Sequence, residues 1–417
     1  MSQQQITETH ADIIDPDVYV KGVPHATFKH LRDEDPVSWC EEPDGPGFWA
    51  VTRYDDLLEV SHQPEFYSSA KGIRLEDMTP EELEARKTMM EMDRPEHTAY
   101  RRLVQPLFLP RVVNTYEEQL RGLARYVIDA VQDKSEFDFV IEIARKLPML
   151  MLGKLLGVPD EDGPWLVRTG DALIGNTDPE FTTHPVDQVD TEAYRLMPFR
   201  SPYSYELFEY AAKQAKLRYD NPTDDLISML LLPKRGGEPL SEHEFKNFFA
   251  LLVAAGNDTT RYTKASGMEA LLNHPEQLAA LRAQPELMPS AVEEMLRWGS
   301  VTMHFRRTAT QDTKLAGKQI KAGDKVVIFF ISADFDDRQF SEPFNFDIKR
   351  TPNEHVAFGL KSPHKCIGEH LARLEVRVLF EELLPRLASI EPNGPIERLR
   401  SNFISGIKHM PVKVTWA

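Results

Sequence analysis

The segment FGLKSPHKCIG, residues 358–368, is followed at once by EHLARLEVRVLFEELLPRL, residues 369–387. Apolar residues recur at helical spacing in the second stretch, which predicts an amphipathic helix. Cys366 therefore lies just before a helix, where backbone N–H groups and the positive end of the helix dipole stabilise a thiolate. Gly368 has no side chain and leaves room for a flat partner. A lone cysteine is more often a small buried hydrophobic residue, so this segment alone leaves both interpretations open.

A second unusual segment is FFALLVAAGNDTT, residues 248–260, which is apolar and then abruptly polar. Gly256 inside a helix costs roughly 1 kcal/mol relative to alanine. A threonine hydroxyl can bond back to a carbonyl one turn earlier and widen the helix into a notch. A notch beside Asp258 and Thr259 is suited to binding dioxygen and relaying protons. The alternative is that Asp258 or Thr259 caps the start of a new helix.

The composition is that of an ordinary globular chain, with 41% hydrophobic and 28% charged residues. The net charge of −17 argues against nucleic acid as a general partner. Two cysteines, Cys40 and Cys366, are too few for a disulfide framework and fit a reducing cytoplasm. No basic-then-apolar leader opens the chain and no apolar run reaches the length of a membrane span, so we expect neither.

The pattern along the chain predicts a single, mainly α-helical domain over residues 1–417 with a small β-rich subdomain, and a disordered tail at residues 1–14. Helical spacing extends from about Pro95 to residue 300, interrupted at 176–202. Strand and hairpin patterns occupy four segments, and residues 334–365 show neither helical nor strand periodicity. These segments are 36–52, 314–325, 326–331 and the C-terminus.

Both unusual segments resemble those of the cytochromes P-450. The cysteine loop of that family is Phe-Gly-x-Gly-x-His/Arg-x-Cys-x-Gly, matched here by Phe358, Gly359, His364, Cys366 and Gly368, and its distal motif is Ala/Gly-Gly-x-Asp/Glu-Thr. One extra residue precedes the cysteine, and Ser362 stands where a second glycine is expected. The resemblance implies the cytochrome P-450 fold and a haem b cofactor. Cys366 would be the axial iron ligand, Asp258 and Thr259 the catalytic pair, and Gly368, Ala255 and Gly256 would contact the haem.

Further residues match the family in the expected order. His97 and Arg101 are four apart on one predicted helix, and with Arg307 and His364 they would hold the haem propionates. Glu294 and Arg297 form the Glu-x-x-Arg pair, to which the resemblance gives a structural role.

The resemblance also implies a monooxygenase that uses O2 and two electrons from a [2Fe-2S] ferredoxin with its NAD(P)H-dependent reductase. The substrate is expected to be small and apolar, with a monoterpenoid favoured and a sterol or fatty acid as alternatives. We expect four basic residues near the cysteine to form a docking surface for the ferredoxin: Lys361, Lys365, Arg102 and Arg373. Expected wall residues of the substrate pocket are Met89, Met90, Leu251, Ala254, Val301, Met303 and Phe403.

Two other classes of protein stay open at this point. One is a peroxide-using or non-catalytic haem-binding protein, against which the Asp258–Thr259 pair argues. The other is a hydrolase that pairs Cys366 with a histidine such as His364 or His370, although such partners generally meet through the fold rather than in sequence.

Overall fold

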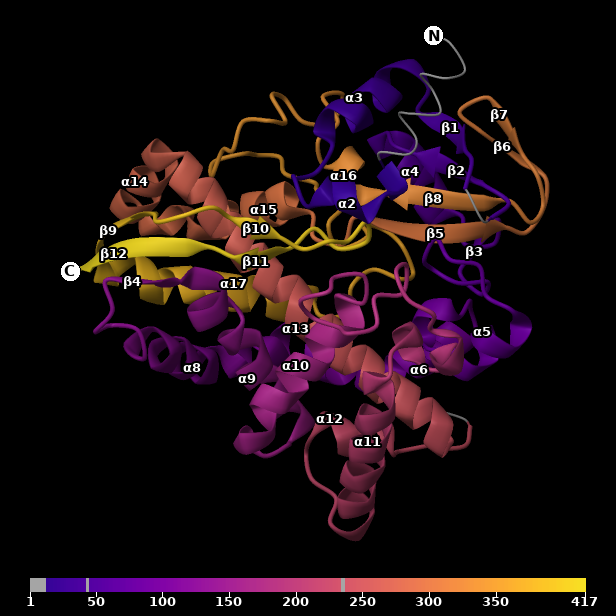
Figure 1. Ribbon diagram of the computed structural model, residues 1–417, viewed down its shortest axis with the longest axis horizontal. Helices are drawn as coiled ribbons and strands as arrows, with labels where there is room; N and C mark the ends of the chain where they lie inside the picture. The colour runs from indigo at the N-terminus through magenta and orange to yellow at the C-terminus, as the bar shows by residue number, and fades with distance from the viewer. Residues whose placement is uncertain (1–12, 43–44, 234–236) are drawn as a thin grey trace.

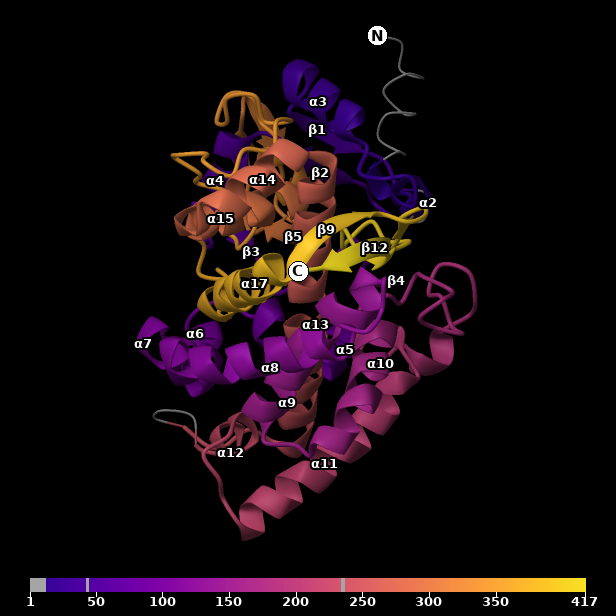
Figure 2. The same cartoon turned by 90° about the vertical axis from the view of Figure 1, so that its left-hand side faces the viewer.

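One long helix, α13 (Glu242–Asn273), crosses the middle of the molecule (Figures 1 and 2). The structure is a computed structural model and describes residues 13–42, 45–233 and 237–417. The helix begins at a capping box, in which the Ser241 hydroxyl accepts from the Glu244 N–H and the Glu244 carboxylate accepts from the Ser241 N–H. Because α13 continues unbroken past Asp258 and Thr259, neither residue is an N-cap.

Helices pack around α13 on several sides. α9, α10, α11 and α15 contact it directly, and α17 packs against both α13 and α15. Within the described residues, no helix combines the length and apolar character needed to cross a membrane. The helices are α2 (Pro16–Tyr19), α3 (His25–Glu34), α4 (Tyr54–His62), α5 (Pro80–Arg86), α6 (Glu96–Val104), α7 (Pro110–Val113), α8 (Glu117–Asp129), α9 (Lys146–Leu156), α10 (Gly163–Ile174), α11 (Tyr203–Asp220), α12 (Leu226–Leu230), α14 (Pro275–Ala283), α15 (Met288–Gly299), α16 (Phe330–Ala333) and α17 (Glu369–Leu383).

The strands form small sheets in two parts of the molecule, the sheet of β1, β2, β3, β5 and β8 on the right of Figure 1 and β4, β9 and β12 on its left. The largest sheet has the order β1-β2-β8-β5-β3, in which β2 and β8 are parallel and the other neighbours antiparallel. A second sheet has the order β4-β12-β9, and β6–β7 and β10–β11 are hairpin-like pairs. The strands are β1 (Val37–Cys40), β2 (Phe48–Val51), β3 (Tyr67–Ser68), β4 (Glu136–Asp138), β5 (His304–Ala309), β6 (Thr313–Leu315), β7 (Lys318–Ile320), β8 (Lys325–Phe329), β9 (Leu387–Pro392), β10 (Glu397–Arg398), β11 (Ile407–His409) and β12 (Pro411–Trp416).

The mainly α architecture with a small β-rich part confirms the predicted fold class. The largest cluster of buried hydrophobic side chains draws on residues from Met89 to Val414, so the helical and C-terminal segments share a core. The strand predicted at 326–331 ends early, because its neighbours β2 and β5 offer no partner beyond Phe329 and the chain turns into α16.

The predicted disordered tail, residues 1–14, mostly falls outside the described residues. At its end the prediction is wrong, because Ile13 is fully buried and its carbonyl accepts a hydrogen bond from the Tyr19 hydroxyl at 3.0 Å. The apolar Ile13 side chain has a core to enter, among Phe28 and Phe48.

Candidate active site

The loop before α17 absorbs its extra residue in a tight turn. Lys361 has a φ of +58° and Gly359 a φ of +73°, so both lie in the left-handed region. The Ser362 N–H donates to the Gly359 carbonyl at 3.3 Å, and the Ser362 hydroxyl accepts from the His364 N–H at 3.1 Å. Ser362 therefore orders the loop in place of the expected glycine, and Cys366 keeps its position before the helix.

The Cys366 side chain faces an internal cavity, and this is why it is accessible although protein surrounds it. Its own N–H donates to the Phe358 carbonyl at 2.8 Å. Burial raises the pKa of the Cys366 thiol, while the Gly368 N–H, Arg101 and Arg373 act to lower it. The Gly368 N–H and the two cations are donors of the kind expected to favour a thiolate.

Four basic side chains gather at the edge of this cavity. Arg101 on α6, Arg307 on β5 and His364 line it, and the His97 ring lies 4.2 Å from the His364 ring. Burial and the neighbouring cations lower the pKa of His97 to about 4, and burial is also the main cause that lowers the pKa of His364 and Arg307. Basic side chains that lower one another's pKa in this way gain from a nearby anion, which would restore their protonated forms.

The distal segment of α13 has the hydrogen bond on which the predicted notch depends. The Thr259 hydroxyl donates to the Ala255 carbonyl at 3.0 Å, and both residues line the cavity that contains Cys366. Gly256 does not line the cavity, and a side chain at this position would contact Leu152 of α9. The structure therefore does not place Gly256 where it would make the predicted contact with the haem. The reason is helical geometry, since neighbouring residues point about 100° apart.

Asp258 is fully buried on another side of α13 and does not line the cavity. Its Oδ1 accepts from the Asn257 amide at 2.9 Å and lies 3.1 Å from Nη2 of Arg261. Arg261 also binds Asp171 of α10 at 2.6 Å. Burial raises the pKa of Asp258 to about 8, against the effect of Arg261. This carboxyl therefore holds a proton near neutral pH.

Glu294 and Arg297 form a fully buried bidentate ion pair on α15 with contacts of 2.7 and 2.8 Å. Arg297 also donates to the carbonyls of Asp334 and Pro343, and Arg350 binds Glu294 at 3.1 Å. These bonds fasten the irregular 334–365 segment to α15, which is a structural role.

Most expected wall residues of the substrate pocket line the cavity or its extension. The extension reaches away from Cys366 between the 73–91 segment and α13, and the part nearest Cys366 has about 1210 Å³ of empty space, some of it open to solvent. Met303 is the exception, because it is fully buried among Phe28 and Phe329 while its neighbour Thr302 faces the cavity. Val301 and Thr302 both line the cavity, whereas the Met303 side chain enters the core instead. The lining residues that were predicted are Met89, Met90, Leu251, Ala254, Val301 and Phe403.

The predicted basic docking surface is partly neutralised. Arg373 binds Glu293 and Glu369 at 2.7 Å, and Lys365 binds Glu369 at 2.5 Å. Lys361 and Arg102 are exposed. The positive surface near Cys366 is therefore smaller than the sequence suggests.

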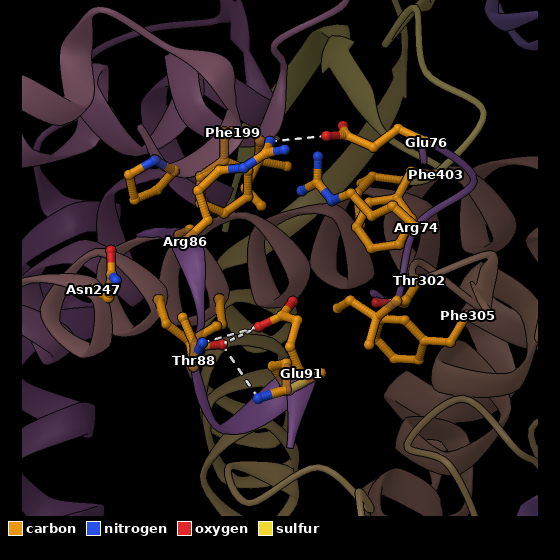
Figure 3. A pocket seen from close by; sticks show the side chains of 18 of the residues that line it. Arg74, Glu76, Arg86, Thr88, Glu91, Phe199, Asn247, Thr302, Phe305 and Phe403 are labelled. Atoms are coloured by element: carbon orange, nitrogen blue, oxygen red, sulfur yellow. Dashed lines mark hydrogen bonds and ion pairs between the residues drawn. The ribbon is translucent and has the colours of Figure 1, made fainter. Parts of the chain in front are cut away.

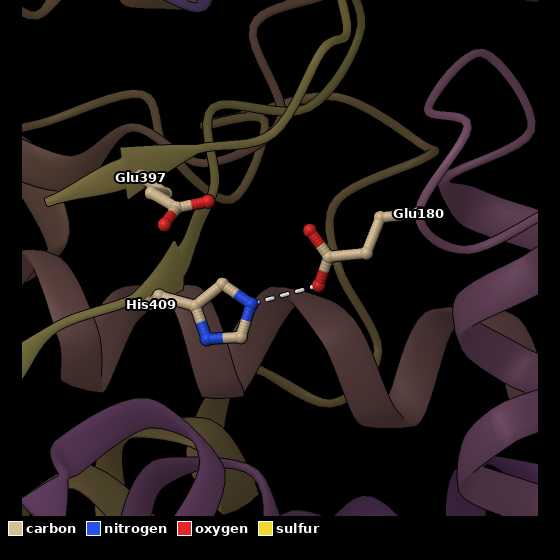
Figure 4. Close-up of side chains that lie close together, drawn as sticks. All are labelled: Glu180, Glu397 and His409. Atoms are coloured by element: carbon tan, nitrogen blue, oxygen red, sulfur yellow. Dashed lines mark hydrogen bonds and ion pairs between the residues drawn. The ribbon is translucent and has the colours of Figure 1, made fainter.

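No described histidine pairs with Cys366. His364 binds the Ser69 hydroxyl at 3.2 Å, and His370 lies 3.9 Å from Glu369. Glu397 of β10, His409 of β11 and Glu180 lie close together (Figure 4), but His409 is held by ion pairs to Glu180 and Asp138 at 2.8 Å. A cysteine hydrolase has no geometric support among the described residues.

Sequence reasoning missed several residues of the site. Arg350 and Asp171 act on predicted residues from distant parts of the chain, Arg261 lies only three residues after Asp258 on α13, and Arg74 enters the cavity extension. Each is an ordinary charged residue in the sequence, and only its buried environment distinguishes it.

Comparisons with known proteins agree with this geometry. The cytochrome P-450 family model matches residues 204–402. The chain is 35% identical to the steroid C26-monooxygenase of Mycobacterium tuberculosis, covering 97% of this chain and 92% of that protein. It is also 35% identical to the linalool 8-monooxygenase of Pseudomonas putida, covering 96% and 98%. A cytochrome P-450 of Mycobacterium marinum, CYP268A2, solved in complex with pseudoionone, superposes with a TM-score of 0.86 at 37% identity over 93% of this chain and 94% of that one.

Proposed function

Because the chain belongs to the cytochrome P-450 family, we propose that it hydroxylates a terpenoid- or steroid-like substrate in the cavity above Cys366, with electrons from a [2Fe-2S] ferredoxin and its NAD(P)H-dependent reductase. It is a monooxygenase that acts on apolar substrates and inserts one oxygen atom of O2. The observation that carries the proposal is that Cys366 and Thr259 face one cavity with basic side chains at its edge.

The cofactor is haem b, and the described residues fit it. The cavity is mainly apolar where a porphyrin would lie, between Leu252 and Ala255 of α13 and the Cys366 loop. Arg101 has no hydrogen-bond acceptor among the described residues, so its donors are free for a propionate. Cys366 would bind the iron, and Arg101, Arg307, His97 and His364 would hold the propionates. The haem supplies the oxygen activation.

Thr259 is placed to position a polar group in the cavity. Its hydroxyl hydrogen is engaged with the Ala255 carbonyl, so its oxygen faces the cavity as an acceptor. The same bond widens α13 locally and leaves space beside the notch. Thr259 therefore binds and orients water or a protonated group next to the reacting centre.

Asp258 acts as a proton reservoir behind the notch. Because it does not line the cavity, it delivers a proton through a water or by rotating its side chain. Asp171, which shares Arg261 with it, lines a separate polar hollow together with Arg145 and Glu180. We assign Asp171 to the path that returns protons from solvent to Asp258.

Residues 1–417 carry no flavin or iron–sulfur motif, and we propose a ferredoxin as the electron donor. The exposed Lys361 and Arg102 are the remaining candidates for contact with an acidic ferredoxin. A cytoplasmic location, expected from the cysteine content, stays a prediction.

The test is turnover of linalool and of a steroid under ¹⁸O2 with NADH, a [2Fe-2S] ferredoxin and its reductase. We expect a product with one ¹⁸O atom and no comparable turnover with peroxide alone. In Thr259→Ala, NADH consumption should continue while the fraction of the consumed electrons that yields product falls. Thr259→Ser should retain most of this fraction. Equal turnover with peroxide alone would support the peroxide-using alternative instead.

A further inference from the structure

The extension of the cavity ends in charged side chains, although the part shared with Cys366 is largely apolar. Four charged residues line the extension but not the part nearest the cysteine: Arg74, Glu76, Arg86 and Glu91 (Figure 3). An apolar substrate alone gives these groups nothing to bind. The contacts of these four side chains therefore indicate which polar group the substrate carries in addition to its apolar body.

Arg74 has no hydrogen-bond acceptor in the described part of the chain. Its guanidinium carbon lies 4.6 Å from the centre of the Phe199 ring and 4.5 Å from the centre of the Phe403 ring (Figure 3). Two aromatic rings stabilise the cation and hold it in place. Its N–H groups are free toward the cavity, and burial lowers its pKa.

Arg86 is a second guanidinium that is only partly satisfied. Its Nη1 binds Glu76 at 2.8 Å, while its buried Nε and Nη2 make no hydrogen bond and Nη2 lies 3.7 Å from Glu82. Glu76 and Glu91 act on Arg74 as opposite charges, and Arg86 acts on it as a like charge. Because Glu76 is bound by Arg86, and no described carboxylate hydrogen-bonds Arg74, the donors of Arg74 favour a ligand that brings its own acceptor.

Glu91 acts on Arg74 as an opposite charge but does not hydrogen-bond it. Its carboxylate accepts from the Thr88 N–H at 3.1 Å and from the Thr88 hydroxyl at 2.7 Å. Burial raises the pKa of Glu91, which weakens its charge further. The acceptor for Arg74 must therefore come from the ligand.

We propose that Arg74 binds a carboxylate at the end of the substrate remote from Cys366, so that the substrate is an apolar molecule with one carboxylate. A carboxylate matches the guanidinium fork and neutralises the charge, whereas a ketone or hydroxyl oxygen leaves the charge unpaired. The apolar body then lies along Leu251, Thr302 and Phe305 toward the site of oxidation. This inference rests on the proposed function, because it assumes that the substrate occupies this cavity.

The test measures dissociation constants by calorimetry for the haem-loaded protein with two matched pairs of probes: dodecanoate against dodecanamide, and geranate against geranamide. We expect at least one carboxylate to bind about 10- to 100-fold more tightly than its amide, the range typical of a charge-assisted hydrogen bond. Arg74→Gln should abolish this preference, and Arg74→Lys should retain part of it. Lys71→Gln, which changes an exposed cation three residues away, should leave it intact.

Equal binding of carboxylate and amide, a preference that survives in Arg74→Gln, or no binding of either carboxylate up to its solubility limit would each overturn the proposal. The carbon monoxide spectrum of the same protein separates this failure from that of the proposed function. A normal haem-thiolate spectrum with no carboxylate preference overturns only the assignment of Arg74.

Discussion

The Asp334 carboxyl is buried, and its ionised form lowers the free energy of unfolding at neutral pH. It is fully buried and its Oδ1 accepts from the Val356 N–H at 2.7 Å, but Oδ2 has no hydrogen bond of good geometry, although the Ser300 hydroxyl lies near it. Burial raises the pKa of Asp334 from 3.8 to about 6. The folded state therefore binds this proton more tightly than the unfolded state, and stability is lost as pH rises between these two values.

We predict that Asp334→Asn stabilises the protein at neutral pH by about 2 kcal/mol, because an amide keeps the bond to Val356 without a buried charge. The gain should be small near pH 4, grow toward about pH 6 and then level off. Urea-unfolding midpoints of the haem-loaded protein across this range measure it. A gain that is largest at the acid end would contradict the assignment.

Asp258 makes a prediction about activity. Since its pKa is raised to about 8, it is protonated below that pH, and turnover limited by proton delivery should fall as pH rises through about 8. Asp258→Asn should slow turnover about 100-fold, within the usual range for a positioned acid, and remove this limb of the pH profile. Steady-state rates with excess ferredoxin and reductase test this. Glu242→Gln, at the exposed start of the same helix, is the control and should leave the profile unchanged.

At the scale of elements, the distance between α13 and α17 determines how far Thr259 lies from Cys366, because α13 holds Thr259 and α17 follows the Cys366 loop. A buried ion pair joins the two helices, with Lys264 Nζ 2.9 Å from Glu375 Oε2 and both side chains nearly inaccessible. Burial lowers the pKa of Lys264 and raises that of Glu375, and each partner opposes the shift of the other. Removing one partner leaves the other charge buried and unpaired.

We predict that Lys264→Met lowers the free energy of unfolding by about 3–5 kcal/mol, whereas the double variant Lys264→Met with Glu375→Leu recovers most of the loss. Urea unfolding of both variants and of the wild type measures the difference. A double variant as unstable as the single one would show that shape, not charge, connects the helices.

At this scale the sequence predicts what local patterns determine. The helix after Cys366, the bond from the Thr259 hydroxyl back to Ala255 and the β1–β2 hairpin follow from periodicity and residue type, and the structure has all three. The pairing of Lys264 with Glu375 links residues more than a hundred positions apart, and no local pattern specifies it.

For the whole molecule, the cavity is built by segments far apart in the sequence: residues 73–91, 174–199, α13, 301–305 and 403–404 (Figure 1). The resemblance to a family gives their order along the chain, which is why most wall residues were predicted. It does not give the charge at the remote end of the cavity. Arg74 acquires its role only when Phe199 and Phe403 fold against it.

The central claim, that Cys366 is the thiolate ligand of a haem in this cavity, is tested most directly by the absorption spectrum of the reduced protein with carbon monoxide. Thiolate ligation by Cys366 predicts a strongly red-shifted Soret band in the wild type, and its loss in Cys366→His with haem still bound. A bound haem without that shift in the wild type, or a shift that persists in Cys366→His, would contradict the account.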